Sequence, residues 1–437
     1  MRKIIIFLLL IVWQSVSRAV EFDAALTATE KWFINTDNGD SQSLRLSLTP
    51  EIDADFNNGW SFKSSLRLQA EAINGLQIND INRGNYSDYS KPALLSRELE
   101  LELREFYIQG EIGTTFLSVG KQQIIWGKAD GLKVLDIVNP QSFREFILDD
   151  FDNSRIPLWT VNIEFPIAEW DFQFLWIPDQ SYHALPKQHA TFAFSSPELV
   201  PALPPGVQVN VEQPRRPNNI FLDSDVGLRA STFWQGWDIT FNYLYQYNNL
   251  PVLNQQVTLS KGIPTVIITP EYKRTHVFGT TFSNAFADWV IRGEIGYFTD
   301  HFFISKTPFQ NQGMVNSPEL HYVLGVDWNA PWNILLSMQL IQSWVIRDAD
   351  KITRDKLDTT FTGLIRRNFL YDSLIAEILL IANTNNGDGI IRPKIIYEWQ
   401  DNINTWIGAD IFYGDKQGIF GQFNQNSRIA IGIEASY

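Results

Sequence analysis

Apolar and polar residues alternate one by one along most of the chain, which is the period of a β-strand with one apolar and one wet face. In residues 237–243 and 99–104 every second residue is apolar and the residues between are polar. Residues 66–71 and 170–174 repeat this period, and no segment of comparable length has helical spacing. The pattern therefore predicts an all-β chain.

Short turns and long polar connections alternate strictly between the predicted strands. The short turns lie near residues 57–59, 110–113, 166–169, 235–236, 287–288, 330–331, 368–372 and 400–402. The long connections lie near residues 35–43, 73–97, 123–155, 178–222, 248–270, 301–318, 347–356, 383–389 and 414–427. This alternation predicts about 18 strands, with 16 as the alternative, and both chain ends on the side of the short turns.

An even number of strands with short turns at one end and long loops at the other is typical of bacterial outer-membrane barrels. A sheet in lipid cannot leave an edge unpaired, so it has to close on itself. About 23 residues are available per strand and connection, which leaves room for the roughly 9–11 residues of a tilted membrane-spanning strand. We therefore expect residues 20–437 to form one transmembrane antiparallel β-barrel in the outer membrane of a Gram-negative bacterium, with short periplasmic turns and long extracellular loops.

The first 19 residues have the pattern of a secretory signal peptide. Arg2 and Lys3 precede an apolar run at residues 4–13, and Ser17-Arg18-Ala19 then supplies small residues at the two positions that a signal peptidase reads. The run is too short to span a bilayer comfortably as a helix. We expect residues 1–19 to be removed on export, with a retained anchor as the less favoured alternative.

Charge and composition narrow the class of protein further. Loss of Arg2, Lys3 and Arg18 lowers the basic residues from 35 to 32 against 49 acids, so the net charge of the mature chain is near −17. Nucleic-acid binders need a basic face, so we expect no nucleic-acid partner. The chain has no cysteine, so its stability has to come from packing and backbone pairing. No second apolar run is long enough for a helical membrane span.

The chain end and the tryptophans both fit a barrel in lipid. Residues 428–437 alternate and end on an aromatic residue, as in the final strands that the barrel-insertion machinery recognises, so we expect this machinery and outer-membrane lipid as partners. The residues of this strand predicted to face lipid are Ile429, Ile431, Ile433, Ala435 and Tyr437. Tryptophans predicted to form interfacial girdles are Trp60, Trp170, Trp176, Trp237, Trp289, Trp328, Trp332, Trp344, Trp399 and Trp406. The alternative for them is core packing in a soluble β protein.

The third long connection, residues 123–155, mixes many large apolar residues with charges. Neither lipid nor water suits both kinds, so we expect this connection to fold into the barrel lumen and to narrow or plug it, with a compact cap on the rim as the alternative. Residues 133–138 are expected to form a short helical turn that ends at Asn139-Pro140. The predicted lumen and constriction residues are Trp126, Lys128, Asp130, Lys133, Asp136, Asn139, Arg144, Glu145, Asp149, Asp150, Asp152 and Arg155 in the connection, with Arg67, Glu100, Glu102 and Arg104 on inward strand faces.

Two further segments carry expectations about local structure. Asp149, Asp150 and Asp152 are expected to pair with Arg144 or Arg155 rather than to bind calcium, because their spacing does not match an EF-hand loop. The proline-rich stretch 199–217 is not expected to pair as a strand and suits an outside loop or lid.

A succession of short motifs begins just before the third long connection and continues through it. The motifs are Gly-Lys-Gln at 120–122, Trp-Gly at 126–127, Asp-Gly at 130–131, Asp136, Asn-Pro at 139–140 and Arg-Glu at 144–145. This succession resembles the hallmark of a proteobacterial outer-membrane barrel family of unknown function, in which an arginine is usual where Lys121 stands. Residues 152–160 and 175–179 continue the resemblance, which covers about 60 residues in detail. The resemblance implies an outer-membrane barrel and no particular substrate.

Catalytic and metal motifs are weak in the sequence. The five histidines are His183, His189, His276, His301 and His321; they are scattered, and their spacing predicts no close metal-binding pair. We find no nucleophile elbow, phosphate loop or dinucleotide-binding glycine pattern, so we expect no enzyme and no cofactor. The leading prediction is an outer-membrane channel or transporter for a small solute or an amphipathic or hydrophobic one. The alternative is a closed barrel that acts as a receptor, an adhesin or the outer-membrane partner of an envelope transport complex, with a possible periplasmic partner.

Overall fold

The computed structural model describes residues 20–437 except 57, 74, 77–84, 130–131, 202–205, 261–262 and 308–309. The predicted signal peptide at 1–19 and the predicted site residue Asp130 lie outside the described residues.

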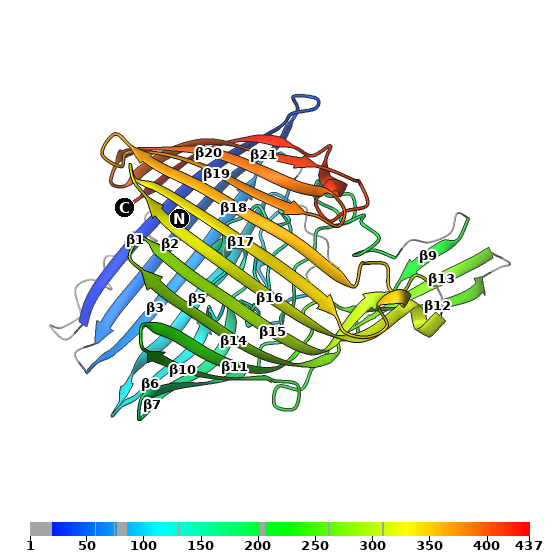
Figure 1. Ribbon diagram of the computed structural model, residues 1–437, viewed down its shortest axis with the longest axis horizontal. Helices are drawn as coiled ribbons and strands as arrows, with labels where there is room; N and C mark the ends of the chain where they lie inside the picture. The colour runs from blue at the N-terminus through cyan, green and yellow to red at the C-terminus, as the bar shows by residue number, and fades with distance from the viewer. Residues whose placement is uncertain are drawn as a thin grey trace, which may run out of the picture.

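The described residues form a closed antiparallel barrel of 18 strands (Figure 1). The first strand pairs with the last, from Thr27 opposite Ser436 to Asn35 opposite Arg428, so no edge of the barrel is left open. The predicted closure and the count of 18 are confirmed. The barrel strands are β1 (Val20–Asn35), β2 (Ser41–Phe56), β3 (Trp60–Glu71), β5 (Leu99–Ile112), β6 (Thr115–Gln122), β7 (Leu158–Ile167), β8 (Trp170–Ile177), β10 (Asp225–Trp234), β11 (Trp237–Tyr247), β14 (Arg274–Phe286), β15 (Trp289–Ile304), β16 (Met314–Ala330), β17 (Ile334–Val345), β18 (Leu357–Phe369), β19 (Leu374–Asn383), β20 (Asp388–Gln400), β21 (Ile403–Tyr413) and β22 (Arg428–Ser436).

Side chains along each strand point alternately outward and inward. In β22 the outward residues Ile429, Ile431 and Ile433 are exposed, whereas the inward residues Arg428 and Ala430 that alternate with them are buried. Outward residues on the other strands are also large and apolar, for example Phe106, Phe241, Leu324, Phe361 and Ile395. The outside of the barrel is therefore apolar, as the period-2 pattern predicts for strands in contact with lipid.

The two ends of the barrel differ. Tight turns close one end, where both chain termini lie, and nine connections close the other end (Figure 1). Two connections predicted to be long are short: only residues 36–40 join β1 to β2, and only residues 384–387 join β19 to β20. The sequence pattern predicts longer connections here because the strand residues next to these two hairpins are polar and resemble loop residues.

The connections contain small elements of their own: β4 (Ala93–Leu94), α3 (Phe151–Ser154), β9 (Gln208–Val211), β12 (Val252–Ser260), β13 (Ile263–Glu271), η1 (Gln310–Gly313), η2 (Ala349–Lys351) and η3 (Gly421–Phe423). Strands β9, β12 and β13 form a separate sheet that projects from the rim (Figure 1). The expectation that residues 199–217 do not pair is wrong for β9, whose four residues contain no proline and pair in parallel with β13. Among the described residues, none of the helices is long and apolar enough to cross a bilayer.

Candidate functional site in the barrel lumen

The described part of the connection between β6 and β7, residues 123–129 and 132–157, lies inside the barrel, and Asn139 joins its two ends through hydrogen bonds. The Asn139 side chain accepts a hydrogen bond from the Ile124 N–H at 2.7 Å and donates one to the Ile156 carbonyl at 2.9 Å. Asn139 is buried, so these two bonds give the Ile124 N–H and the Ile156 carbonyl the partners that water would otherwise supply. The connection therefore leaves the wall and returns to it at neighbouring points. The helical turn predicted at 133–138 is absent from these described residues; the one helical turn of the connection is α3, after Asp150.

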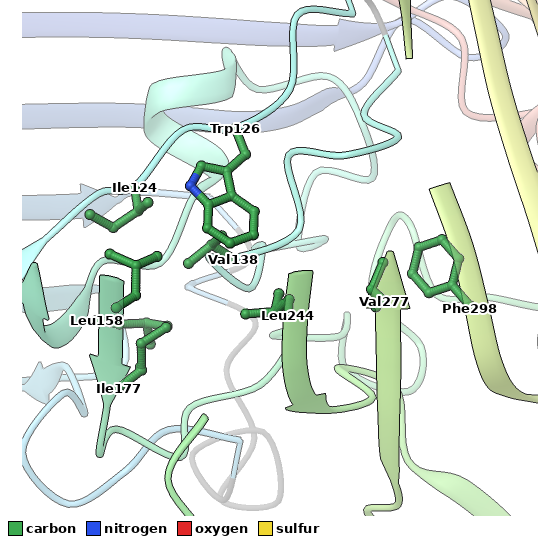
Figure 2. Close-up of a cluster of buried hydrophobic side chains, with 9 residues drawn as sticks. Ile124, Trp126, Val138, Leu158, Ile177, Leu244, Val277 and Phe298 are labelled. Atoms are coloured by element: carbon green, nitrogen blue, oxygen red, sulfur yellow. The ribbon is translucent and has the colours of Figure 1, made fainter. Parts of the chain in front are cut away.

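An apolar cluster fixes the first part of the connection against the wall (Figure 2). Ile124, Trp126 and Val138 pack against inward side chains at the ends of β7, β8, β11, β14 and β15, namely Leu158, Leu175, Ile177, Leu244, Val277 and Phe298. The Trp126 indole N–H donates to the Gln173 side chain at 2.7 Å. The expectation that inward strand residues are polar is wrong for this part of the wall, where apolar side chains meet the apolar half of the connection.

Glycines on the wall make room for this packing. A Cβ on Gly227 would lie 2.9 Å from the Trp126 ring, and a Cβ on Gly296 would lie 2.8 Å from the Leu135 side chain. Both separations are shorter than a van der Waals contact between carbon atoms. The wall is therefore shaped to receive Trp126 and Leu135.

Glu294 of β15 holds the next segment through backbone groups. Its carboxylate accepts hydrogen bonds from the N–H groups of Lys128, of Ala129 at 2.7 Å and of Leu135 at 2.9 Å. The Lys128 ammonium reaches Asp238 of β11 and the Ser283 hydroxyl of β14. Hydrogen bonds to a charged acceptor are stronger than neutral ones, so Glu294 is a principal support of the connection. The sequence analysis missed Glu294, because nothing along the chain relates it to a segment about 160 residues earlier.

The opposite side of the connection is held by ion pairs to β2, β5 and β22. Arg144 forms two hydrogen bonds to Glu100, at 2.9 and 3.2 Å. Glu145 accepts hydrogen bonds from Arg45 of β2 at 2.6 Å and from Arg428 of β22 at 2.7 Å. Residues from both ends of the chain therefore meet at one carboxylate of the connection.

Arg67, Glu102 and Arg104 lie directly beneath the turn α3. Glu102 accepts from Arg67 at 2.5 Å and from Arg104 at 3.3 Å. Arg104 also donates to the Asp152 carbonyl at 2.6 Å, and Arg67 to the Asn153 carbonyl at 3.4 Å. The predicted inward strand residues thus lie against the predicted connection residues.

A second set of ion pairs joins residues within the connection itself. Arg155 donates to Asp136 at 2.8 Å and to Asp152 at 2.5 Å. The predicted pairing with Arg155 is therefore confirmed for Asp152. It is wrong for Asp149, which lies 3.9 Å from Arg45, and Arg144 pairs with Glu100 instead of an aspartate.

Burial and neighbouring charges shift the pKa values of three groups in these connections. Burial alone would raise the pKa of Glu145, but the Arg45 and Arg428 guanidinium groups outweigh it and hold this pKa at about 2. Burial lowers the pKa of Lys133 to about 8, although Asp136 favours the charged form. Burial and the Lys133 charge lower the pKa of His183 to about 3, and its Nδ1 accepts a hydrogen bond from the Gln141 N–H at 2.9 Å.

Two cavities lie on either side of the connection. One has a volume of about 300 Å³ and is lined by Phe143, Phe146, Lys133, His183 and Phe298 among others. The other has a volume of about 490 Å³ and lies between the connection and the inner faces of β17 to β22. Three residues of the connection line both cavities: Ile147, Asp149 and Phe151. These three residues are therefore part of the wall that the two spaces share, which we call the partition.

Lys133 is expected to give the lumen a charge that titrates near neutral pH. Its ammonium lies 3.5 Å from Asp136 and 4.6 Å from the centre of the Phe151 ring, beside the partition. With a pKa of about 8, it is charged at pH 7 and loses its proton as the pH rises through 8. Loss of this positive charge between pH 7 and pH 9 should shift the selectivity of a conducting barrel towards cations, measured as a shift of the reversal potential in a salt gradient.

The Lys133→Met variant is the control for this titration and should remove the step near pH 8. An equal step in the variant would assign the titration to another group.

One cluster contradicts the expectation that the histidines are scattered. His301 of β15 and His321 of β16 both lie beside the buried Glu319 of β16. The usable signal in the sequence is Glu-x-His within one strand, which places both side chains on the same face.

The fold is similar to solved barrels at low sequence identity. Against the crystal structure of Acinetobacter baumannii OccAB1 the TM-score is 0.53 at 8% identity, covering 97% of this chain and 99% of that chain. Against the crystal structure of Pseudomonas aeruginosa OpdK with vanillate the TM-score is 0.50 at 9% identity, covering 95% of this chain and 98% of that chain. At such identities the likeness establishes the barrel fold.

No curated protein matches the chain. A family profile does match, and it spans residues 28–433, which include every barrel strand in whole or in part. The chain therefore belongs to the family described as "Protein of unknown function (DUF1302)".

Proposed function

We propose that the protein is an outer-membrane channel for a small amphipathic or hydrophobic solute, and that the connection 123–157 sets the narrowest point of its path. The observation that carries the proposal is the partition of the lumen: Ile147, Asp149 and Phe151 separate two cavities of about 300 and 490 Å³. A solute that moves along the barrel axis has to pass these three side chains.

The outer surface supports a membrane location. A closed sheet leaves no backbone group of its edges unpaired, and the outward side chains are large and apolar. Exposed Trp234, Trp289, Trp332 and Trp399 gather at the short-turn end, where amphipathic rings suit a headgroup region. By analogy with other outer-membrane barrels, this end faces the periplasm.

The lining of the smaller cavity supports the class of solute. Phe143, Phe146 and Leu250 offer apolar surface, while Lys133 and His301 offer polar groups. A mostly apolar pocket with a few fixed polar groups recognises an amphipathic molecule better than a hydrated ion. The structurally similar OpdK was solved with vanillate, a small molecule of this general character.

Single-channel recording in planar bilayers tests the proposal. The mature chain, a variant that lacks residues 128–150 and the double variant Ile147→Ala/Phe151→Ala are compared. Both variants are expected to conduct severalfold more than the wild type, because each removes part of the partition. The double variant keeps every ion pair of the connection and so separates widening of the path from loss of folding.

The matched control is Phe361→Ala/Ile365→Ala, which removes one phenylalanine and one isoleucine from the outer face of β18. Its conductance should equal that of the wild type. Absence of current in all four proteins would refute the channel and favour a closed barrel that serves as a receptor, an adhesin or a partner of a periplasmic transport complex.

A further inference from the structure

Three potential metal ligands converge at the long-connection end of the barrel. His301 comes from β15, and Glu319 and His321 come from the adjacent strand β16, where they lie on the same face. His301 Nδ1 lies 2.7 Å and His321 Nε2 lies 2.9 Å from the same carboxylate oxygen, Oε2 of Glu319. The three ligand atoms all lie within 4.8 Å of one another.

The pairing of β15 with β16 creates this arrangement. The register shifts between Phe298 and His301, and His301 then lies opposite Ser317. An irregularity of this kind changes the direction of the following side chains. Here it brings His301 towards Glu319 although Glu319 pairs with Phe298 along the ladder.

Contacts from two other elements fix the orientation of Glu319. Its other oxygen, Oε1, accepts hydrogen bonds from Arg354 at 2.7 Å and from the Ser343 hydroxyl. Arg354 belongs to the connection between β17 and β18, and Ser343 belongs to β17. The carboxylate is therefore held by one oxygen and presents the other to the two imidazoles, as carboxylates that ligate metals are commonly supported.

The three converging atoms are in ion-pair contact with one another, but they make no well-directed hydrogen bond among the described residues, although Glu319 is fully buried. The separations of 2.7 and 2.9 Å are short enough for hydrogen bonds, but the directions of approach are not those of hydrogen bonds. Contacts with such poor direction leave part of the bonding capacity of this carboxylate oxygen and these ring nitrogens unused, which costs free energy at a buried position. A cation at the centre of the three atoms would satisfy all of them.

The cluster is open to the lumen. The His301 and His321 side chains are 33% and 25% exposed, and His301 lines the cavity of about 300 Å³. An ion can therefore reach the cluster, and one coordination position can face the cavity. Two imidazole nitrogens and one carboxylate oxygen with an open position form a ligand set that suits zinc, copper, iron or nickel.

We propose that His301, Glu319 and His321 bind one divalent first-row transition ion, with water or a solute in the cavity as the remaining ligand. Ligands placed 2.0–2.1 Å from a tetrahedral zinc ion lie about 3.3 Å apart, so the side chains have to separate by roughly half an ångström. The two histidines are only partly buried and can make this adjustment.

Equilibrium dialysis of the detergent-solubilised barrel against Zn²⁺, without a histidine tag, tests the proposal. The wild type should bind one Zn²⁺ per chain. His301→Gln and His321→Gln should each lose this binding, since each removes one of only three protein ligands. Ser343→Ala keeps all three ligands but removes a support of Glu319, and it should weaken Zn²⁺ binding by about 10–100-fold.

His276→Gln is the matched control. His276 is exposed on β14, its Nδ1 lies 2.9 Å from the Tyr243 hydroxyl, and it is not one of the three converging ligands. Heat-modifiable mobility in a denaturing gel confirms that each variant is a folded barrel. Substoichiometric Zn²⁺ in the wild type, or equal binding by the wild type and a folded His321→Gln barrel, would overturn the proposal. So would an equal loss in His276→Gln.

Discussion

The Glu145→Ala barrel is expected to conduct more than the wild type and with larger fluctuations, because the substitution releases the connection from two sides of the wall. Glu145 is the one carboxylate in the described connection that bridges Arg45 of β2 and Arg428 of β22. Removing one partner of a buried ion pair costs about 3–5 kcal/mol. The cost should fall at the lower end of this range, because Arg428 keeps Asp410 at 2.8 Å. Single-channel recording and urea unfolding followed by tryptophan fluorescence measure the two effects.

Asp348→Asn is the control for this substitution, since it removes a carboxylate charge from an exposed pair with Lys351 in another connection and keeps a residue type that tolerates the left-handed backbone there. Exposed pairs contribute little to stability, so conductance and unfolding should match the wild type. Wild-type conductance in Glu145→Ala would show that the connection stays in place without this carboxylate.

The ion pairs of Glu145 with Arg45 and Arg428 should also persist in mild acid. The pKa of Glu145 is lowered from 4.5 to about 2 in the folded protein, so its stabilisation is fully present above pH 4.5. It declines progressively as the pH falls from 4.5 to about 2, and only near pH 2 does the carboxylate of the folded protein itself take up a proton. The conductance change caused by loss of these ion pairs should therefore be absent at pH 3 and appear near pH 2.

Trp126→Ala is expected to destabilise the folded barrel by about 3–5 kcal/mol, the usual cost of truncating a buried tryptophan. Only 2% of Trp126 is exposed, and its ring fills the space between the connection and the wall strands (Figure 2). Gln173 would also lose the indole N–H at 2.7 Å. Urea unfolding of the refolded barrel in lipid vesicles measures this cost.

Trp332→Ala serves as the comparison, because Trp332 is 79% exposed in a short turn. Its loss should change the free energy of unfolding by much less. Equal destabilisation by the two substitutions would mean that the cluster around Trp126 contributes no more than a surface side chain.

The strands were predictable from the sequence because lipid on one side and a polar lumen on the other impose strict alternation. The position of the connection was predictable from its mixture of apolar and charged residues, which neither lipid nor water could accept. The residues that hold the connection were not predictable, because Glu294 and Arg428 lie on strands that come close to the connection only once the barrel closes. Glu-x-His places Glu319 and His321 on one face, but the approach of His301 depends on a register shift that no local pattern reveals. The apolar wall near Leu175 has a signal in the sequence, because residues 174–177 are all apolar, as expected for a strand end with lipid on one face and apolar protein on the other.

The bridge at Glu145 has a consequence for assembly. Its two arginines are separated by almost the whole barrel sequence, and the contact with Arg428 spans 283 residues. Contacts of such high sequence separation form late, because the intervening chain has to be ordered first. The connection is therefore fixed on this side only after the last strand has joined the wall, so a barrel that still lacks β22 holds it loosely, and fixation of the connection reports that assembly has finished.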